Sequence, residues 1–137
     1  MPIPDIDDAD IDALLEKLNA TSEDEALTLD DARRAVIRGH RHVHACPGAG
    51  KTTLIGLKLV LLAQKWPWRH RGLCVLTHTN VAKDEIIRRV GTDAAARSLI
   101  IYRHFIGTIQ DFVQTFLALP ACRSKGYPIR QIDDSAT

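Results

Sequence analysis

A glycine-rich segment in the first half of the chain has the residue types of a phosphate-binding loop. It lies between a short apolar segment and a predicted helix and reads Ala45-Cys46-Pro47-Gly48-Ala49-Gly50-Lys51-Thr52-Thr53. Glycines at positions 48 and 50 allow main-chain N–H groups to turn toward a phosphate chain, and the following helix directs its positive end at the same anion. Lys51 is placed to reach terminal phosphates and the Thr52 hydroxyl to ligate Mg²⁺. All nine residues are therefore predicted to hold a nucleotide, with Lys51 as the catalytic residue. The alternative is a glycine-rich turn that binds nothing.

Two further polar segments each come directly after an expected strand. Thr77-His78-Thr79-Asn80 follows the first of these strands, and Gly107-Thr108-Ile109-Gln110-Asp111-Phe112 follows the second. Hydroxyls, amides and exposed main-chain N–H groups at strand ends are suited to contacting phosphates without reading base sequence. These segments are candidate nucleic-acid contacts, although an exposed His78 without a role is a plausible alternative.

Apolar spacing predicts alternating helices and strands, which favours an α/β fold with a parallel sheet. After residue 108 we expect a helix with Ile109, Phe112, Val113, Phe116 and Leu117 on one stripe, ending at Pro120. The other expected helices cover residues 8–19, 29–38, 51–64 and 80–90, and the expected strands cover 42–46, 73–77, 99–102 and 129–132. The strand at 73–77 is apolar throughout, which predicts burial on both faces.

The three polar segments, in this order, resemble the motifs of the UvrD/Rep-like family of superfamily 1 DNA helicases. That family has an A-x-A/P-G-S/A-G-K-T loop, which also accounts for Ala45 where the general pattern has glycine. It then has T-x-T-N-x-A-A-x-E-M-x-x-R, matched here by Thr77, Thr79, Asn80, Ala82, Glu85 and Arg89, and G-T-x-H-S-F, matched by Gly107, Thr108 and Phe112.

The resemblance implies a RecA-like P-loop NTPase fold, with helices on both faces of a parallel sheet that is incomplete in this chain. It implies ATP and Mg²⁺ as cofactors and ATP-driven movement along single-stranded DNA, usually 3′ to 5′. It also implies that the strand-end contacts are made by His78, Thr79, Asn80, Gly107, Thr108 and Gln110. The charges of Arg88, Arg89 and Arg97 favour attraction of the DNA, with a solvated helix face as the alternative for Arg88 and Arg97.

The sequence departs from the family pattern at several positions. Ala32 stands where the family has an adenine-reading Gln, Gln110 replaces a His, and Asp111 replaces a Ser. No D-E-x-Q-D motif, which would supply the metal-binding Asp and the water-activating Glu, follows the expected strands. We therefore expect the N-terminal part of a helicase, which binds nucleotide without efficient hydrolysis and needs the missing motor lobe as a partner. The alternatives are a non-catalytic nucleic-acid-binding module and a small-molecule kinase.

Charge divides the chain into an acidic leader at residues 1–28, expected to be helical, and a helicase-like part at 29–137. Residues 1–31 contain eleven Asp and Glu and one Lys, whereas residues 32–137 contain six acidic residues and seventeen Lys and Arg. Such a basic part favours an anionic partner. Alternatively, the leader packs against the basic part and neutralises it.

The remaining features give weaker indications. The N-terminus lacks a signal-peptide pattern, and the apolar run Leu54–Ala63 is short and contains Lys58, so we expect a cytoplasmic protein without a membrane partner. Its three cysteines form no CxxC pair, which argues against a disulfide framework. His40, His42 and His44 alternate and could mimic a metal site. Trp66 and Trp68 are expected to pack a helix end against the sheet, with base stacking as the alternative.

Overall fold

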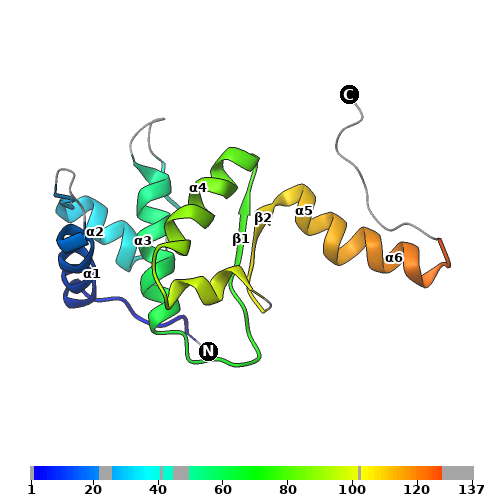
Figure 1. Ribbon diagram of the computed structural model, residues 1–137, viewed down its shortest axis with the longest axis horizontal. Helices are drawn as coiled ribbons and strands as arrows, with labels where there is room; N and C mark the ends of the chain where they lie inside the picture. The colour runs from blue at the N-terminus through cyan, green and yellow to red at the C-terminus, as the bar shows by residue number, and fades with distance from the viewer. Residues whose placement is uncertain (1, 22–25, 41, 45–49, 102, 128–137) are drawn as a thin grey trace.

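The computed structural model of the chain describes residues 2–21, 26–40, 42–44, 50–101 and 103–127 (Figure 1). Helices and strands alternate after residue 50, and the only sheet within the described ranges has two strands. The elements are α1 (Asp8–Thr21), α2 (Asp31–Arg38), α3 (Lys51–Gln64), β1 (Cys74–Thr77), α4 (Asn80–Gly91), the 3₁₀ helix η1 (Ala96–Ile100), β2 (Phe105–Thr108), α5 (Ile109–Val113), the π-type turn η2 (Gln114–Ala118) and α6 (Leu119–Ser124).

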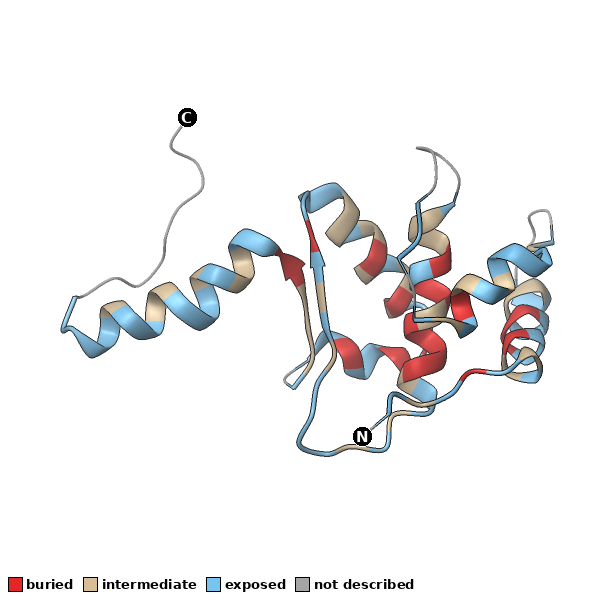
Figure 2. Cartoon of the chain, turned by 180° about the vertical axis from the view of Figure 1, so that it is seen from behind, coloured by how far each residue is buried: buried red, intermediate tan, exposed pale blue. Residues whose placement is uncertain are grey.

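Helix α3 lies at the centre of the hydrophobic core. Seven of its fourteen residues are buried, because α1 and α2 contact it from one side and α4 and η1 from the other (Figures 1 and 2). Its residues from Leu54 to Leu62 are mostly apolar, as expected for a helix that packs against other elements on more than one side. The helix that begins at the phosphate-loop lysine is therefore held firmly by packing.

The leader helix α1 belongs to this same core. Ile11, Leu14 and Leu15 lie on one face of the helix and are buried among the side chains of the core. Its acidic residues form ion pairs with basic residues of the body: Arg34–Asp12 at 2.6 Å, Arg38–Asp8 and Lys65–Asp10. Lys17 of the leader pairs in the opposite sense with Asp93 of the body at 2.7 Å. The leader thus packs against the basic part of the chain, as the second interpretation of the charge asymmetry proposed.

Strands β1 and β2 are parallel, with Cys74 opposite Phe105 and Thr77 opposite Thr108. They are connected through α4, which covers one face of the pair. The prediction that the first strand is buried on both faces is wrong, since Leu76 is 46% exposed while Val75 packs against the core. An apolar strand can thus leave one face uncovered, and within the described residues the sheet is covered less fully than predicted.

Two of the expected strands differ in the structure. Residues 99–101 are not a strand: Leu99 and Ile100 end the 3₁₀ helix η1, and β2 begins at Phe105. Asp93 fixes this helix, because its Oδ1 accepts the N–H groups of Ala95 and Ala96, and the three-residue spacing then buries Ala96 and Leu99 together. Gly107-Thr108 accordingly end the strand itself. Residues 42–44 are also not a strand, since they form no bridge with another described strand; residues 45, 46, 102 and 129–132 lie outside the described ranges.

The helical segment α5–η2–α6, here called the arm, extends away from the core (Figure 1). None of its residues is buried, and the stripe residue Phe116 is 50% exposed (Figure 2). The prediction that Pro120 ends this helix is wrong. The π-type turn ends at Ala118, directly before α6, and Pro120 lies in the first turn of α6, where its missing N–H costs little.

Candidate functional site

The phosphate-loop sequence enters the structure at Gly50, where α3 begins. Ala45, Cys46, Pro47, Gly48 and Ala49 lie outside the described residues. Gly50, the residue directly before the helix, has φ +77°, a left-handed conformation that glycine adopts without strain. It makes no side-chain hydrogen bond to the first turn of the helix. Gly50 therefore supplies no capping side chain to the first turn of α3, and the main-chain N–H groups of such a helix start are suited to binding an anion.

A groove of about 250 Å³ lies beside this helix start. Gly50 and Thr53 form one wall, and Leu27, Thr28, Leu29 and Arg33 form the other. Ala32, at the expected adenine-reading position, is exposed, and its neighbour Arg33 lines the groove instead. Nothing in the residue types of 27–29 points to a ligand, so their place in the lining of this groove could not be predicted.

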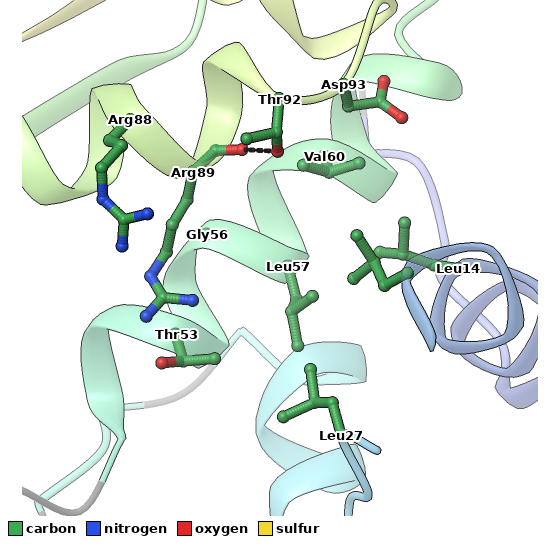
Figure 3. A pocket seen from close by; sticks show the side chains of 11 residues that line it. Leu14, Leu27, Thr53, Gly56, Leu57, Val60, Arg88, Arg89, Thr92 and Asp93 are labelled. Carbon is green, nitrogen blue, oxygen red and sulfur yellow. Dashed lines mark hydrogen bonds between the residues drawn. The ribbon is translucent and has the colours of Figure 1, made fainter. Parts of the chain in front are cut away.

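A pocket of about 150 Å³ is lined by residues of α3, α4 and the leader (Figure 3). Arg89 reaches across it, and Figure 3 shows its guanidinium beside Thr53. The stem of Arg89 passes Gly56 so closely that an added Cβ there would lie 3.1 Å from the Arg89 Cδ. Arg89 therefore packs on the helix that follows the phosphate loop.

Glu85 holds both arginines of α4. Its carboxylate accepts hydrogen bonds from Arg88 at 2.9 Å and from the Arg89 Nε at 2.7 Å, and these bonds, first that of Arg88, lower the pKa of Glu85. The Glu85 carboxylate thus partly neutralises the charges of Arg88 and Arg89, which weakens the expectation that these two arginines attract DNA at the strand ends. Arg97, the third such residue, is exposed and donates to the Gly91 carbonyl at 2.9 Å.

The two strand-end segments meet in one groove, as the parallel sheet predicts. This groove, of about 560 Å³, is here called the strand-end groove, and it is lined by His78, Thr79, Asn80, Thr108, Ile109, Gln110 and Val113. The carboxyl ends of neighbouring parallel strands lie at one edge of a sheet, so two motifs that are thirty residues apart in the sequence lie close together in space. Gly107 is the exception, because it is buried in β2, where an added Cβ would lie 2.7 Å from the Phe105 ring.

The threonines of this groove also fix the helices that follow. Thr79 Oγ1 accepts the Ala82 N–H at 3.2 Å, and Thr108 Oγ1 accepts the Asp111 N–H at 3.0 Å. Thr108 is buried and its side chain also bonds the Asp111 carboxylate, whereas Thr79 is exposed. The hydroxyl that the strand-end groove can offer to a ligand is therefore that of Thr79.

Asp111, which departs from the family pattern, completes a capping box. Its Oδ2 accepts the Thr108 N–H at 3.0 Å, and Lys83 lies 3.3 Å from the same oxygen. The Thr108 N–H, the other bonds to Thr108 and Lys83 lower the pKa of Asp111. The spacing Thr108-x-x-Asp111 follows the capping-box pattern, so the sequence carried a signal for this role.

Two other expectations concern ions and membranes. Within the described residues, no three His, Cys, Asp or Glu side chains gather as a metal site would require, and His42 and His44 are exposed. No described helix is long and apolar enough to cross a bilayer.

Helices packed around a parallel pair of strands, with polar loops gathered at the carboxyl ends of those strands, define an α/β protein. Residues 29–134 match the model of the UvrD/REP helicase N-terminal domain, and the chain belongs to this family. The resemblance expected from the three motifs is thereby confirmed. No match is found among curated proteins or among solved structures.

Proposed function

We propose that the chain binds ATP through residues 45–53 and forms the ATP-binding part of a UvrD-like DNA helicase. The observation that carries this proposal is the start of α3: a left-handed Gly50 without a side-chain cap, followed by Lys51 and Thr52 on a helix held by the core. The donor set fits a triphosphate, since main-chain N–H groups, an ammonium and a hydroxyl are the groups that bind phosphates and Mg²⁺. Lys51 would contact the terminal phosphates and Thr52 the Mg²⁺.

The strand-end groove is the proposed site for single-stranded DNA. His78, Asn80 and Gln110 are exposed, and Thr79 and Thr108 are held by their capping bonds. Amide and hydroxyl groups at this position contact phosphates without selecting bases, and the imidazole of His78 offers a ring for stacking. Both sites are on or next to α3 and α4, which pack against each other.

Coupling of ATP hydrolysis to DNA translocation and unwinding is proposed for the complete helicase, with the second motor lobe as its partner. The 137 residues contain no D-E-x-Q-D sequence, so the chain alone has the phosphate-binding groups without the acidic groups of hydrolysis. We expect nucleotide binding without efficient hydrolysis. The second candidate is a non-catalytic nucleic-acid-binding module of helicase origin, which is supported by the strand-end groove with its exposed His78, Asn80 and Gln110.

Titration with a fluorescent ATP analogue and Mg²⁺ tests the nucleotide site. Lys51→Ala removes a charge-assisted contact worth about 1.5–3 kcal/mol, so its affinity is expected to fall by about ten- to a hundredfold. Lys125→Ala, which removes a charge at the end of the arm, is the matched control and leaves affinity unchanged. Equal affinity of the wild type and Lys51→Ala would defeat the assignment. Salt-sensitive DNA binding that ignores both ATP and Lys51→Ala would favour the non-catalytic module.

A further inference from the structure

A second groove lies at the opposite ends of the strands from the strand-end groove. It has a volume of about 800 Å³ and is lined by Arg69, His70, Arg103 and His104, with Ile101, Phe105 and Phe116 as its apolar part. Leu73 and Phe105, joined by a hydrogen bond of 2.8 Å from the Phe105 N–H to the Leu73 carbonyl, mark where the two strands begin. Strands of four residues span about 13 Å. We call this site the basic groove, and it is separate from the groove that follows the strands.

The loop that carries Arg69 is held in a fixed conformation. The Trp66 indole donates to the Arg71 carbonyl at 2.9 Å, and the Arg103 guanidinium donates to the Arg69 carbonyl at 2.6 Å. Trp66 also packs edge-on against Trp68, with ring centroids 4.8 Å apart. The loop therefore presents its arginines on a rigid support, and the hydrogen bonds that hold it use main-chain oxygens of Arg69 and Arg71.

A strained backbone position lies beside this loop. Arg103 has φ +91°, a conformation that non-glycine residues rarely adopt, and its carbonyl oxygen occupies the space that a Cβ at Gly72 would need, 1.3 Å away. His104 is anchored as well, since its Nδ1 accepts the Leu73 N–H at 3.0 Å. An arginine kept in an unfavourable conformation at the edge of a groove is a reason to look for a ligand there.

The basic groove is positive and lacks carboxylates. No Asp or Glu occurs between Lys65 and Thr79 or between Ala94 and Gln110. Arg69, Arg71 and Arg103 are exposed, and none of the ion pairs seen among the described residues involves them. Such a concentration of guanidinium groups favours a polyanionic ligand.

We propose that the basic groove is a second binding site for single-stranded nucleic acid. Guanidinium groups contact the phosphates, while Phe116, 50% exposed, offers a ring to an unpaired base. The base faces of a duplex are already stacked, and an acidic peptide has no base to stack on Phe116. Duplex nucleic acid and acidic peptides as ligands therefore explain the apolar wall of the groove less well. The proposal does not depend on the strand-end groove, because the two sites share no residue.

The test measures binding of an oligothymidylate of about twelve nucleotides to the full 137-residue chain over a range of salt concentrations. Arg69→Ala combined with Arg71→Ala keeps the carbonyls that hold the loop, and it removes one charge that lines the basic groove and a second one from the same loop. We expect affinity about tenfold lower at low salt, and a salt slope reduced by at least about 0.7, the value for one phosphate contact on a single strand. Phe116→Ala is expected to weaken binding by at least about fivefold.

The matched control is Arg123→Ala combined with Lys125→Ala, which removes the same charge from the far end of the arm and should leave the affinity and the slope unchanged. Equal losses in the two double variants would overturn the proposal, as would competition by polyglutamate or duplex DNA as strong as by the oligonucleotide. His78→Ala separates the two sites. If His78→Ala abolishes all binding while the Arg69/Arg71 variant has none of the expected effect, the proposal for the basic groove is refuted and that for the strand-end groove is supported. If only the Arg69/Arg71 variant weakens binding, the proposal for the strand-end groove alone is refuted.

Discussion

The leader helix provides the sharpest test of how this chain is held together. The family match begins at residue 29, which by itself would make residues 1–28 an accessory segment. In the structure, however, Ile11 of the leader is only 1% exposed and lies in the same core as Leu57 and Val60 of α3. Ile11→Ala should therefore destabilise the whole domain.

The size of the effect follows from the burial. Ile11→Ala removes three buried carbons, worth about 2.4 kcal/mol at about 0.8 kcal/mol each, and the cavity left behind raises the loss to about 3–4 kcal/mol. This is a large part of the 5–15 kcal/mol by which typical domains are stable. With a urea m-value of about 2 kcal/mol/M, the unfolding midpoint should fall by about 1.5–2 M.

Urea unfolding followed both by circular dichroism and by fluorescence of Trp66 and Trp68 measures this change. Glu16→Ala, an exposed change on the same helix, is the control and should shift stability by less than about 0.5 kcal/mol. In the fluorescence signal the midpoint of Ile11→Ala should lie well below that of Glu16→Ala, because the loop that carries both tryptophans unfolds with the core. Equal midpoints for the two variants would refute the shared core.

Two further predictions concern single residues. Gly50→Ala has open space for its Cβ but must keep φ +77°, so it should lower the free energy of unfolding in urea by about 1–2 kcal/mol. Gly50→Asn should lower it less, because Asn tolerates this conformation. Equal stability of the wild type and the Ala variant would contradict the left-handed geometry. Burial, together with the charge of Arg103, lowers the pKa of His104 from 6.5, so the unfolded chain binds more protons than the folded chain. The contribution of His104 to stability is therefore complete above about pH 6.5 and is lost as the pH falls below this value. His104→Asn, which keeps an acceptor for the Leu73 N–H, should flatten the dependence of the urea midpoint on pH below about pH 6.5. An unchanged profile would exclude His104 as its source.

The helices were predictable because their signals are local. Ile11, Leu14, Leu15 and Leu18 recur at helical spacing, and α1 is found over Asp8–Thr21. Helices α3 and α4 likewise follow long apolar or amphipathic patterns with clear ends. The meeting of the two strand-end motifs was also predictable, since it depends only on parallel pairing.

The strands were harder to place because a short apolar run fits a strand or a buried helical turn equally well. The apolar run at Leu99 and Ile100 predicts a strand, but these residues form a helical turn because the Asp93 carboxylate fixes the turn before them. Lys17 of the leader pairs with this carboxylate. A partner seventy-six residues away leaves no local pattern. The basic groove was hidden for the same reason, since its arginines come from segments that only the folded sheet brings together.

The lack of buried residues in the arm has a consequence for its dynamics. Residues 109–124 are held to the body mainly by the capping box at Thr108 and by rings of Phe105, Phe112 and Phe116 packed against one another, whereas α3 cannot open without exposing the core. Amide hydrogens of the arm can exchange with solvent by local fraying that leaves the rest of the molecule intact. The arm and the core thus form two cooperative units of very different protection, and they meet at Thr108.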